Sequence, residues 1–158
     1  MPVAGNAIKF GTDGWRGIIG DDFTFDRLAL VAPAAARVLS QTYGTGSNKT
    51  IIIGYDRRFM AEVFAKRAAE AVTAAGFDVL FAQTYAPTPA FSWAAKQYNA
   101  LGALVITASH NPKNYNGIKV YGSDGGQLLT EASLKLSSYI DTVKDPLNIQ
   151  TEAFEVLK

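Results

Sequence analysis

Residues 103–106 read Ala-Leu-Val-Ile, and uninterrupted apolar runs of this kind decide the fold. Two similar runs precede it in the chain, Ile51-Ile52-Ile53 and Val79-Leu80-Phe81. A strand with one face in solvent alternates apolar and polar residues, whereas a strand buried on both faces does not. The three runs therefore predict strands of a largely parallel sheet that is covered by helices on both faces.

Helical patterns separate these runs. Apolar side chains recur at helical spacing in 59–75, where Glu62 and Lys66 form an i,i+4 pair and Gly76 stands at the position of a C′ glycine. A shorter helix is expected from about Thr88 to Asn99. The order strand, helix, strand, helix, strand is typical of right-handed βαβ crossovers.

Further elements flank this core. Apolar residues between Leu28 and Leu39 predict a helix with Thr24 as its N-cap, which Pro33 should kink or shorten. Residues 117–121 alternate like a strand, with Lys119 on the face opposite its two apolar neighbours. Thr130 opens a last helix.

The predicted fold class is α/β, a three-layer α/β/α sandwich with a mixed, mostly parallel sheet. We expect one domain over residues 1–145, followed by an exit segment over residues 146–158.

Composition excludes several classes of protein. With 158 residues, 48% of them hydrophobic, the chain is a globular domain and not a disordered one. Its net charge of +1 provides no strong attraction for nucleic acid or anionic lipid. The lack of cysteine excludes thiolate metal sites and suits a reducing compartment. Without a secretion signal or an apolar run of membrane-spanning length, the chain is expected to be soluble and cytoplasmic, with no nucleic-acid or membrane partner.

Polar segments follow the predicted strands, at the edge where parallel sheets bind ligands. They are residues 54–58, 86–89 and 107–112. The first two have ordinary interpretations that we favour when each is taken alone: a surface ion pair between Asp56 and Arg57, and a proline turn that starts a helix.

The third segment contains Ser109, His110 and Asn111, the imidazole being the only one in the chain. An Asn-Pro turn would explain part of it. However, a hydroxyl, an imidazole and an amide together at a strand end favour a functional site. The loop is rich in small and polar residues that can offer N–H groups to an anion. Lys119, just beyond it, could hold a phosphate or accept a proton.

Residues 10–17 read Phe-Gly-Thr-Asp-Gly-Trp-Arg-Gly. Glycines here allow close approach to a ligand, and the planar guanidinium of Arg16 suits phosphate. A tight turn with Trp15 packed in the core explains the same residues equally well.

These motifs resemble those of the α-D-phosphohexomutase superfamily, which includes phosphoglucomutases, phosphomannomutases and phosphoglucosamine mutases. Residues 107–112, followed by Asn116-Gly117-Ile118-Lys119, are similar to its phosphoserine loop. Residues 10–17 resemble its N-terminal signature, and residues 54–58 and 87–89 match two further segments in the expected order. The resemblance extends over about residues 8 to 145.

The resemblance implies a mechanism. Ser109 would carry a phosphoryl group, donate it to a hexose phosphate to form a hexose 1,6-bisphosphate, and take back the other phosphoryl group. His110 and Lys119 would move protons, and Arg16 would orient phosphate. Thr12 and Asn111 would bind phosphate or substrate together with Arg16 and Lys119.

The resemblance also implies Mg²⁺, bound by a phosphate oxygen on Ser109 and by three aspartates of a DGDGD-type loop. Residues 122–126, Gly-Ser-Asp-Gly-Gly, contain only one aspartate and do not form that loop. We therefore expect a first domain whose partners are a hexose phosphate and the remaining domains of the same mutase, inactive by itself. The preferred hexose and the oligomeric state stay open.

Two other interpretations remain. A stand-alone, non-catalytic domain could bind phosphosugars or proteins, with Ser109 unmodified and with binding that survives Ser109→Ala. A phosphatase using the same loop ranks last, because it needs metal ligands or a base partner that the sequence does not show.

Overall fold

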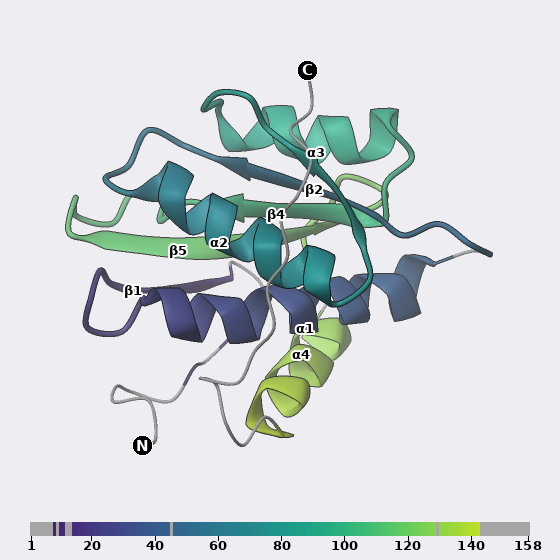
Figure 1. Cartoon of the computed structure of the whole chain (residues 1–158), viewed down its shortest axis with the longest axis horizontal. Coiled ribbons are helices and arrows are strands. Elements are labelled where there is room, and N and C mark those ends of the chain that lie inside the picture. The colour runs from purple at the N-terminus through teal and green to yellow at the C-terminus, as the bar shows by residue number, and fades with distance from the viewer. Residues whose placement is uncertain (1–7, 9, 12–13, 45, 129, 143–158) are drawn as a thin grey trace.

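A computed structural model of the chain describes residues 8, 10–11, 14–44, 46–128 and 130–142. Within these residues, five strands form one sheet in the order β1-β5-β4-β2-β3 (Figure 1). The strands are β1 (Trp15–Ile18), β2 (Thr50–Tyr55), β3 (Asp78–Phe81), β4 (Gly102–Ile106) and β5 (Tyr115–Gly122). The helices are α1 (Phe25–Tyr43), α2 (Ala61–Ala74), α3 (Thr88–Gln97) and α4 (Thr130–Thr142).

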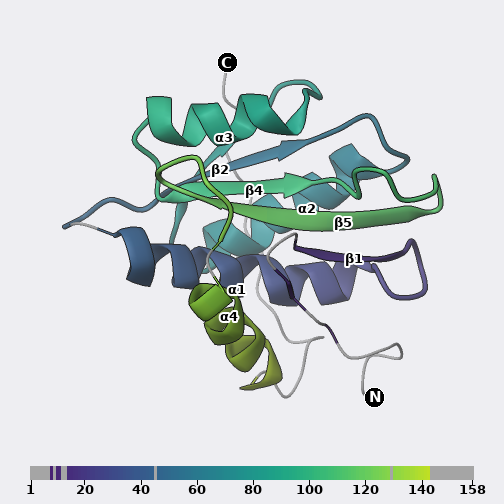
Figure 2. The same cartoon turned by 180° about the vertical axis from the view of Figure 1, so that it is seen from behind.

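The sheet is mixed. β2 pairs in parallel with β3 and β4, whereas β5 pairs antiparallel with β4 and β1. Only β5 therefore runs against the others, which confirms the mostly parallel sheet (Figure 2).

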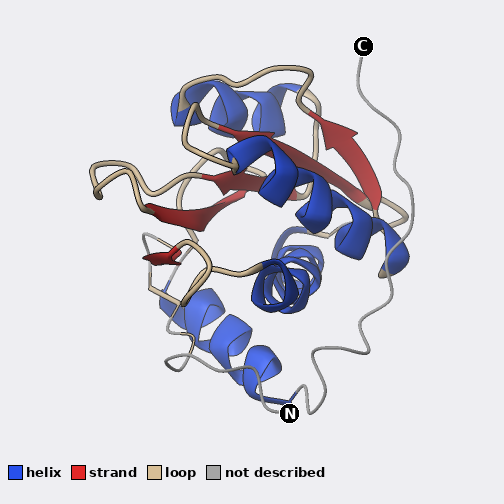
Figure 3. Ribbon diagram, turned by 60° about the vertical axis from the view of Figure 1, so that its left-hand side comes forward, coloured by secondary structure: helices blue, strands red, loops and turns tan. Residues whose placement is uncertain are grey.

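Helices cover both faces of the sheet. α1 and α2 pack on one face, α3 packs on the other against β4 and β2, and α4 packs on α1 (Figure 3). This arrangement confirms the expected α/β/α layers.

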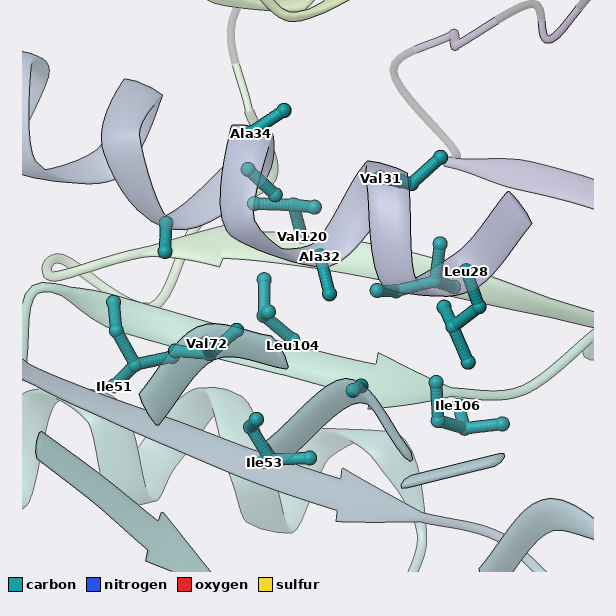
Figure 4. Packing of buried hydrophobic residues seen from close by; sticks show 14 of the residues in the cluster. Leu28, Val31, Ala32, Ala34, Ile51, Ile53, Val72, Leu104, Ile106 and Val120 are labelled. Atoms are coloured by element: carbon teal, nitrogen blue, oxygen red, sulfur yellow. The ribbon is translucent and has the colours of Figure 1, made fainter. Parts of the chain in front are cut away.

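The core follows from the alternation of side chains along the central strands. On the α1 and α2 side, the strands bury Ile51, Ile53, Leu104 and Ile106 against helical residues such as Leu28 (Figure 4). On the α3 side, they bury Ile52, Ala103 and Val105 against Phe91 and Ala95. β2 and β4 are thus covered on both faces, as their apolar runs predict.

The prediction that an apolar run is buried on both faces is wrong for β3. Of Val79, Leu80 and Phe81, only Phe81 is buried. β3 is an edge strand, and α3 packs over β2 and β4 instead. An apolar run in the sequence does not reveal which strand is at the edge.

The helical predictions hold in most respects. Thr24 caps α1 by accepting the Arg27 amide at 3.2 Å, and α1 continues for 19 residues through Pro33. Pro33 does not shorten this helix, because burial against the sheet, α2 and α4 outweighs its low helix propensity. Glu62 and Lys66 pair at 3.1 Å, and Gly76 has a φ of +95° just after α2, as expected.

None of the helices within the described ranges combines the length and apolar character needed to cross a membrane. The expected exit segment, residues 146–158, lies outside the described residues.

Candidate functional site

The polar segments that follow β2, β3 and β4 meet at one edge of the sheet, as predicted. The Asp56 amide donates to the Ile106 carbonyl at 3.1 Å, and the Ala86 amide donates to the Tyr55 carbonyl at 3.1 Å. A pocket of about 610 Å³ opens there. It is lined by Asp56, Arg57, Arg58, Tyr85, Ala86, Pro87 and Ser109.

Ser109 has an unusual backbone. Its φ is +50°, in the left-handed region that residues with a β-carbon rarely adopt. Its N–H donates to the Thr107 hydroxyl at 3.1 Å, and its carbonyl accepts a short hydrogen bond from Arg58 Nη2. Among the described residues, the Ser109 hydroxyl itself has no hydrogen-bond partner and is therefore available for chemistry.

Arg58 holds the loop that contains Ser109. Besides the Ser109 carbonyl, Nη2 donates to the carbonyl of Asn111 at 2.8 Å. Nη1 donates to the carbonyls of Pro112 at 2.9 Å and Tyr115 at 3.3 Å. One side chain just after β2 thus binds three carbonyls of the β4–β5 loop and the carbonyl of Tyr115, the first residue of β5.

Asp56 lies between these groups. Its carboxylate accepts the Thr107 hydroxyl at 2.6 Å and the Arg58 backbone N–H at 3.0 Å, and it pairs with Arg58 Nε at 3.8 Å. The ion pair expected with Arg57 is therefore wrong. The exposed Arg57 guanidinium lies instead over the Tyr85 ring, 4.9 Å from its centroid.

Arg16 joins the N-terminal segment to this loop. It lies in β1 opposite Gly117, and a β-carbon on Gly117 would approach Arg16 Cγ to 2.9 Å. The arginine stem therefore lies across Gly117, and Nη1 donates to Asn111 Oδ1 at 2.9 Å. Arg16 Nε is buried and, within the described part of the chain, has no hydrogen-bond partner.

Lys119 lies on the same face of the sheet as Arg16. The β1–β5 register makes the two residues diagonal neighbours, about 7–8 Å apart between backbone positions. Lys119 is half-buried and, among the described residues, its amine makes no hydrogen bond or ion pair. Two cationic side chains thus share this face next to the serine loop.

The expected site residues have different outcomes. Arg16, Asn111 and Ser109 come together in one hydrogen-bonded region, with Lys119 beside it. His110 is exposed and is not among the described residues that line the pocket. Thr12 lies outside the described residues. Trp15 packs in the core, as the ordinary interpretation of its segment requires.

Sequence reasoning missed the roles of Asp56, Thr107 and Arg58. The spacing Asp-x-Arg directly after a buried strand is a signal for such a turn, since an aspartate there can accept the amide two residues later. Nothing in the sequence shows that Arg58 reaches a loop more than fifty positions away.

The described residues do not by themselves fit the expected Mg²⁺. Among them, no group of three or more His, Cys, Asp or Glu residues could hold a metal ion. Asp56, the carboxylate next to Ser109, is already engaged by Thr107 and Arg58.

These observations define an α/β/α domain with a rigidly held serine loop beside two cationic side chains. Residues 7–146 match the family described as phosphoglucomutase/phosphomannomutase, alpha/beta/alpha domain I. The chain therefore belongs to this family and corresponds to its domain I.

Individual relatives agree with this assignment. A phosphoglucomutase of Staphylococcus aureus strain RF122 is 45% identical over an alignment of 149 positions that covers 90% of this chain and 26% of the relative. A structure from Thermus thermophilus, assigned as a phosphomannomutase, has a TM-score of 0.84 at 31% identity and covers 97% of this chain and 33% of its own. Parafusin from Paramecium, a phosphoglucomutase, shares the fold with a TM-score of 0.75 at 21% identity, over 86% of this chain and 26% of its own. The chain thus spans about a quarter of the length of the curated relative.

Proposed function

We propose that this chain is the phosphoserine domain of a hexose-phosphate mutase, with Ser109 as the residue that carries the phosphoryl group. The observation that supports this most strongly is the geometry of Ser109. Its peptide is fixed on both sides, its hydroxyl has no partner among the described residues, and it lines the pocket at the edge of the sheet.

The proposed reaction has two transfers. In the first, a hydroxyl of a hexose monophosphate attacks the phosphorus of phosphorylated Ser109, the P–O bond to the serine oxygen breaks, and a hexose 1,6-bisphosphate forms. In the second, the serine oxygen attacks the other phosphate of that intermediate, which leaves the isomeric hexose monophosphate. Each attacking hydroxyl loses a proton and each leaving oxygen gains one.

The residues near Ser109 have properties suited to these steps. A phosphoserine carries roughly −1.5 to −2 charges, which cations must balance for transfer. Among the described residues, Arg16 Nε is buried without a hydrogen-bond partner and the Lys119 amine has none, so both side chains can supply positive charge and hydrogen bonds. We propose that Arg16, Lys119, Asn111 and Thr12 bind phosphate or substrate, and that Lys119 and His110 move protons.

The same proposal includes Mg²⁺ and the other domains of the mutase. The phosphate on Ser109 would offer one oxygen to the metal, but the described residues supply no carboxylate set to complete its site. We therefore assign no step to the metal. We propose further that residues 1–145 form the domain, that residues 146–158 lead out of it, and that the chain alone does not turn over hexose phosphate.

Phosphopeptide mapping tests this function. The longest native protein that contains this chain should be purified from its source and digested. We expect phosphate on the peptide with Ser109 and none there in the Ser109→Ala variant. A bare Ser109 that also fails to take up phosphate from hexose 1,6-bisphosphate would contradict the proposal and favour a non-catalytic binding domain.

A further inference from the structure

The strained backbone of Ser109 is held by residues that follow β2 and β4. A serine at a φ of +50° needs its surroundings to maintain that conformation, because the left-handed region is disfavoured for residues with a β-carbon. Both peptide groups of Ser109 are fixed, the N–H by Thr107 and the carbonyl by Arg58.

The direction of the Thr107 hydroxyl is set by Asp56. Thr107 is buried, and its hydroxyl donates its single proton to the Asp56 carboxylate at 2.6 Å. The hydroxyl oxygen can then only accept, and the donor that it receives is the Ser109 N–H at 3.1 Å. Asp56 thereby orients an acceptor toward the serine peptide.

Arg58 completes the arrangement from the other side. Its four hydrogen bonds to carbonyls, three in the loop and one at the start of β5, use both terminal nitrogens, and its Nε lies 3.8 Å from the Asp56 carboxylate. Although Arg58 lines the pocket, the donors that an anion would need are occupied by backbone. In Arg16, by contrast, Nη1 is the terminal nitrogen that makes a hydrogen bond within the described part of the chain, to Asn111 Oδ1 at 2.9 Å.

We infer that Asp56, Thr107 and Arg58 are positioning residues that hold Ser109 in its left-handed conformation for phosphoryl transfer. The inference rests on the proposed function in one respect, that Ser109 is the residue phosphorylated. The serine oxygen is leaving group in one transfer and nucleophile in the other, so a displaced peptide slows both steps.

The test compares Thr107→Val with Thr107→Ser in the longest native protein that contains this chain. Valine keeps the shape but removes the hydroxyl, whereas serine keeps the hydroxyl. Thr73→Val in α2 is the matched control, because the Thr73 hydroxyl is buried and has no partner among the described residues. Two quantities are measured: the Ser109 φ in a crystal structure of each variant, and kcat and KM for hexose 1-phosphate.

We expect Thr107→Val to move Ser109 out of the left-handed region and to lower kcat by about tenfold or more, with KM within about twofold. Thr107→Ser should restore the conformation and most of kcat, and Thr73→Val should match the parent. If Thr107 only contributed packing, the Thr107→Ser variant would also lose activity, the thermal unfolding midpoint would fall, and kcat and KM would both change.

Asp56→Asn provides a second variant should Thr107→Val fail to fold. The amide has one acceptor oxygen, so it cannot accept both the Thr107 hydroxyl and the Arg58 N–H. The same shift in Ser109 and the same loss of kcat are expected.

A Ser109 φ that stays near +50° in Thr107→Val or Asp56→Asn overturns the inference. If the parent is active, a kcat of these variants equal to that of the parent also overturns it. A parent whose Ser109 never takes up phosphate refutes the proposed function instead, and the measured φ then still decides whether these residues hold the serine.

Discussion

The Arg16 guanidinium donates a 2.9 Å hydrogen bond to the side-chain oxygen of Asn111, 95 positions later in the chain. This bond joins β1, a strand at the edge of the sheet, to the loop that follows β4, the central strand of the sheet. The N-terminal motif and the serine loop are thus parts of one site, although neither motif alone indicates it.

Replacing Arg16 with alanine should weaken the binding and orientation of phosphate beside Ser109. A hydrogen bond to a charged group contributes roughly 1.5–3 kcal/mol, so kcat/KM of the full protein should fall by about 10- to 150-fold. Arg37→Ala, at an exposed position of α1, is the control and should retain parental kinetics. Equal kcat/KM for Arg16→Ala and the parent would remove Arg16 from the site.

The positive φ of Ser109 predicts an unusual order of stability. Glycine adopts this conformation without strain, so Ser109→Gly should be more stable to urea than Ser109→Ala by about 1 kcal/mol. At Ser138, an exposed position within α4, the order should reverse, since alanine favours a helix over glycine by a similar amount. Finding alanine more stable than glycine at both positions would show that Ser109 is not strained.

Gly14 should tolerate no side chain. It has a φ of +91°, and a β-carbon there would lie 2.1 Å from the Ile118 carbonyl oxygen in β5. Gly20 has a similar φ of +85° but open space around it, so Gly20→Ala should cost only the backbone strain, roughly 1–2 kcal/mol.

Gly14→Ala should cost more than Gly20→Ala in urea unfolding, and should also slow phosphate uptake because β1 carries Arg16. Equal losses in the two variants would mean that Gly14, the residue before β1, does not lie against the Ile118 carbonyl of β5.

The free energy of unfolding should fall at high pH, partly because the Tyr55 hydroxyl ionises more easily in the unfolded chain than in the folded protein. Burial, with a smaller contribution from Glu62, raises the pKa of Tyr55 above its usual value of 10. The folded protein then keeps a proton that the unfolded chain loses, so this contribution is fully present below pH 10 and is lost as the pH rises through the folded pKa.

The Tyr55→Phe variant isolates that contribution. Its free energy of unfolding relative to the parent should be constant between about pH 7 and 9 and should move in favour of the variant above about pH 10. Tyr43→Phe should behave in the same direction, because burial and then Asp124 raise the pKa of Tyr43 as well. A difference between Tyr55→Phe and the parent that stays constant from about pH 7 to 11 would contradict this.

Much of the fold could be predicted from the sequence, because burial on both faces leaves a direct pattern in β2 and β4. The edge position of β3 could not, since it depends on where α3 packs. Nor does the sequence indicate β1 as a strand: its four residues, Trp15–Ile18, are polar and small in part, and only pairing with β5 fixes their conformation.

For the site, the sequence identified the residue types that carry chemistry but not those that hold them in place. Ser109 stands out because a hydroxyl, an imidazole and an amide lie together at a strand end, and Arg16 because a guanidinium among glycines suits phosphate. Arg58 does not, because its role arises from hydrogen bonds to backbone carbonyls, which any loop sequence offers.

The most direct test of the central claim is a single-turnover transfer from labelled protein. The longest native protein that contains this chain is labelled with ³²P from hexose 1,6-bisphosphate, freed of excess sugar, and mixed with unlabelled hexose 1-phosphate. We predict that label maps to Ser109 before mixing and afterwards appears first in hexose 1,6-bisphosphate and then in hexose 6-phosphate, together one equivalent per labelled serine, with no label taken up by Ser109→Ala. Label that is found on another residue, or that stays on Ser109 after mixing, would contradict the account.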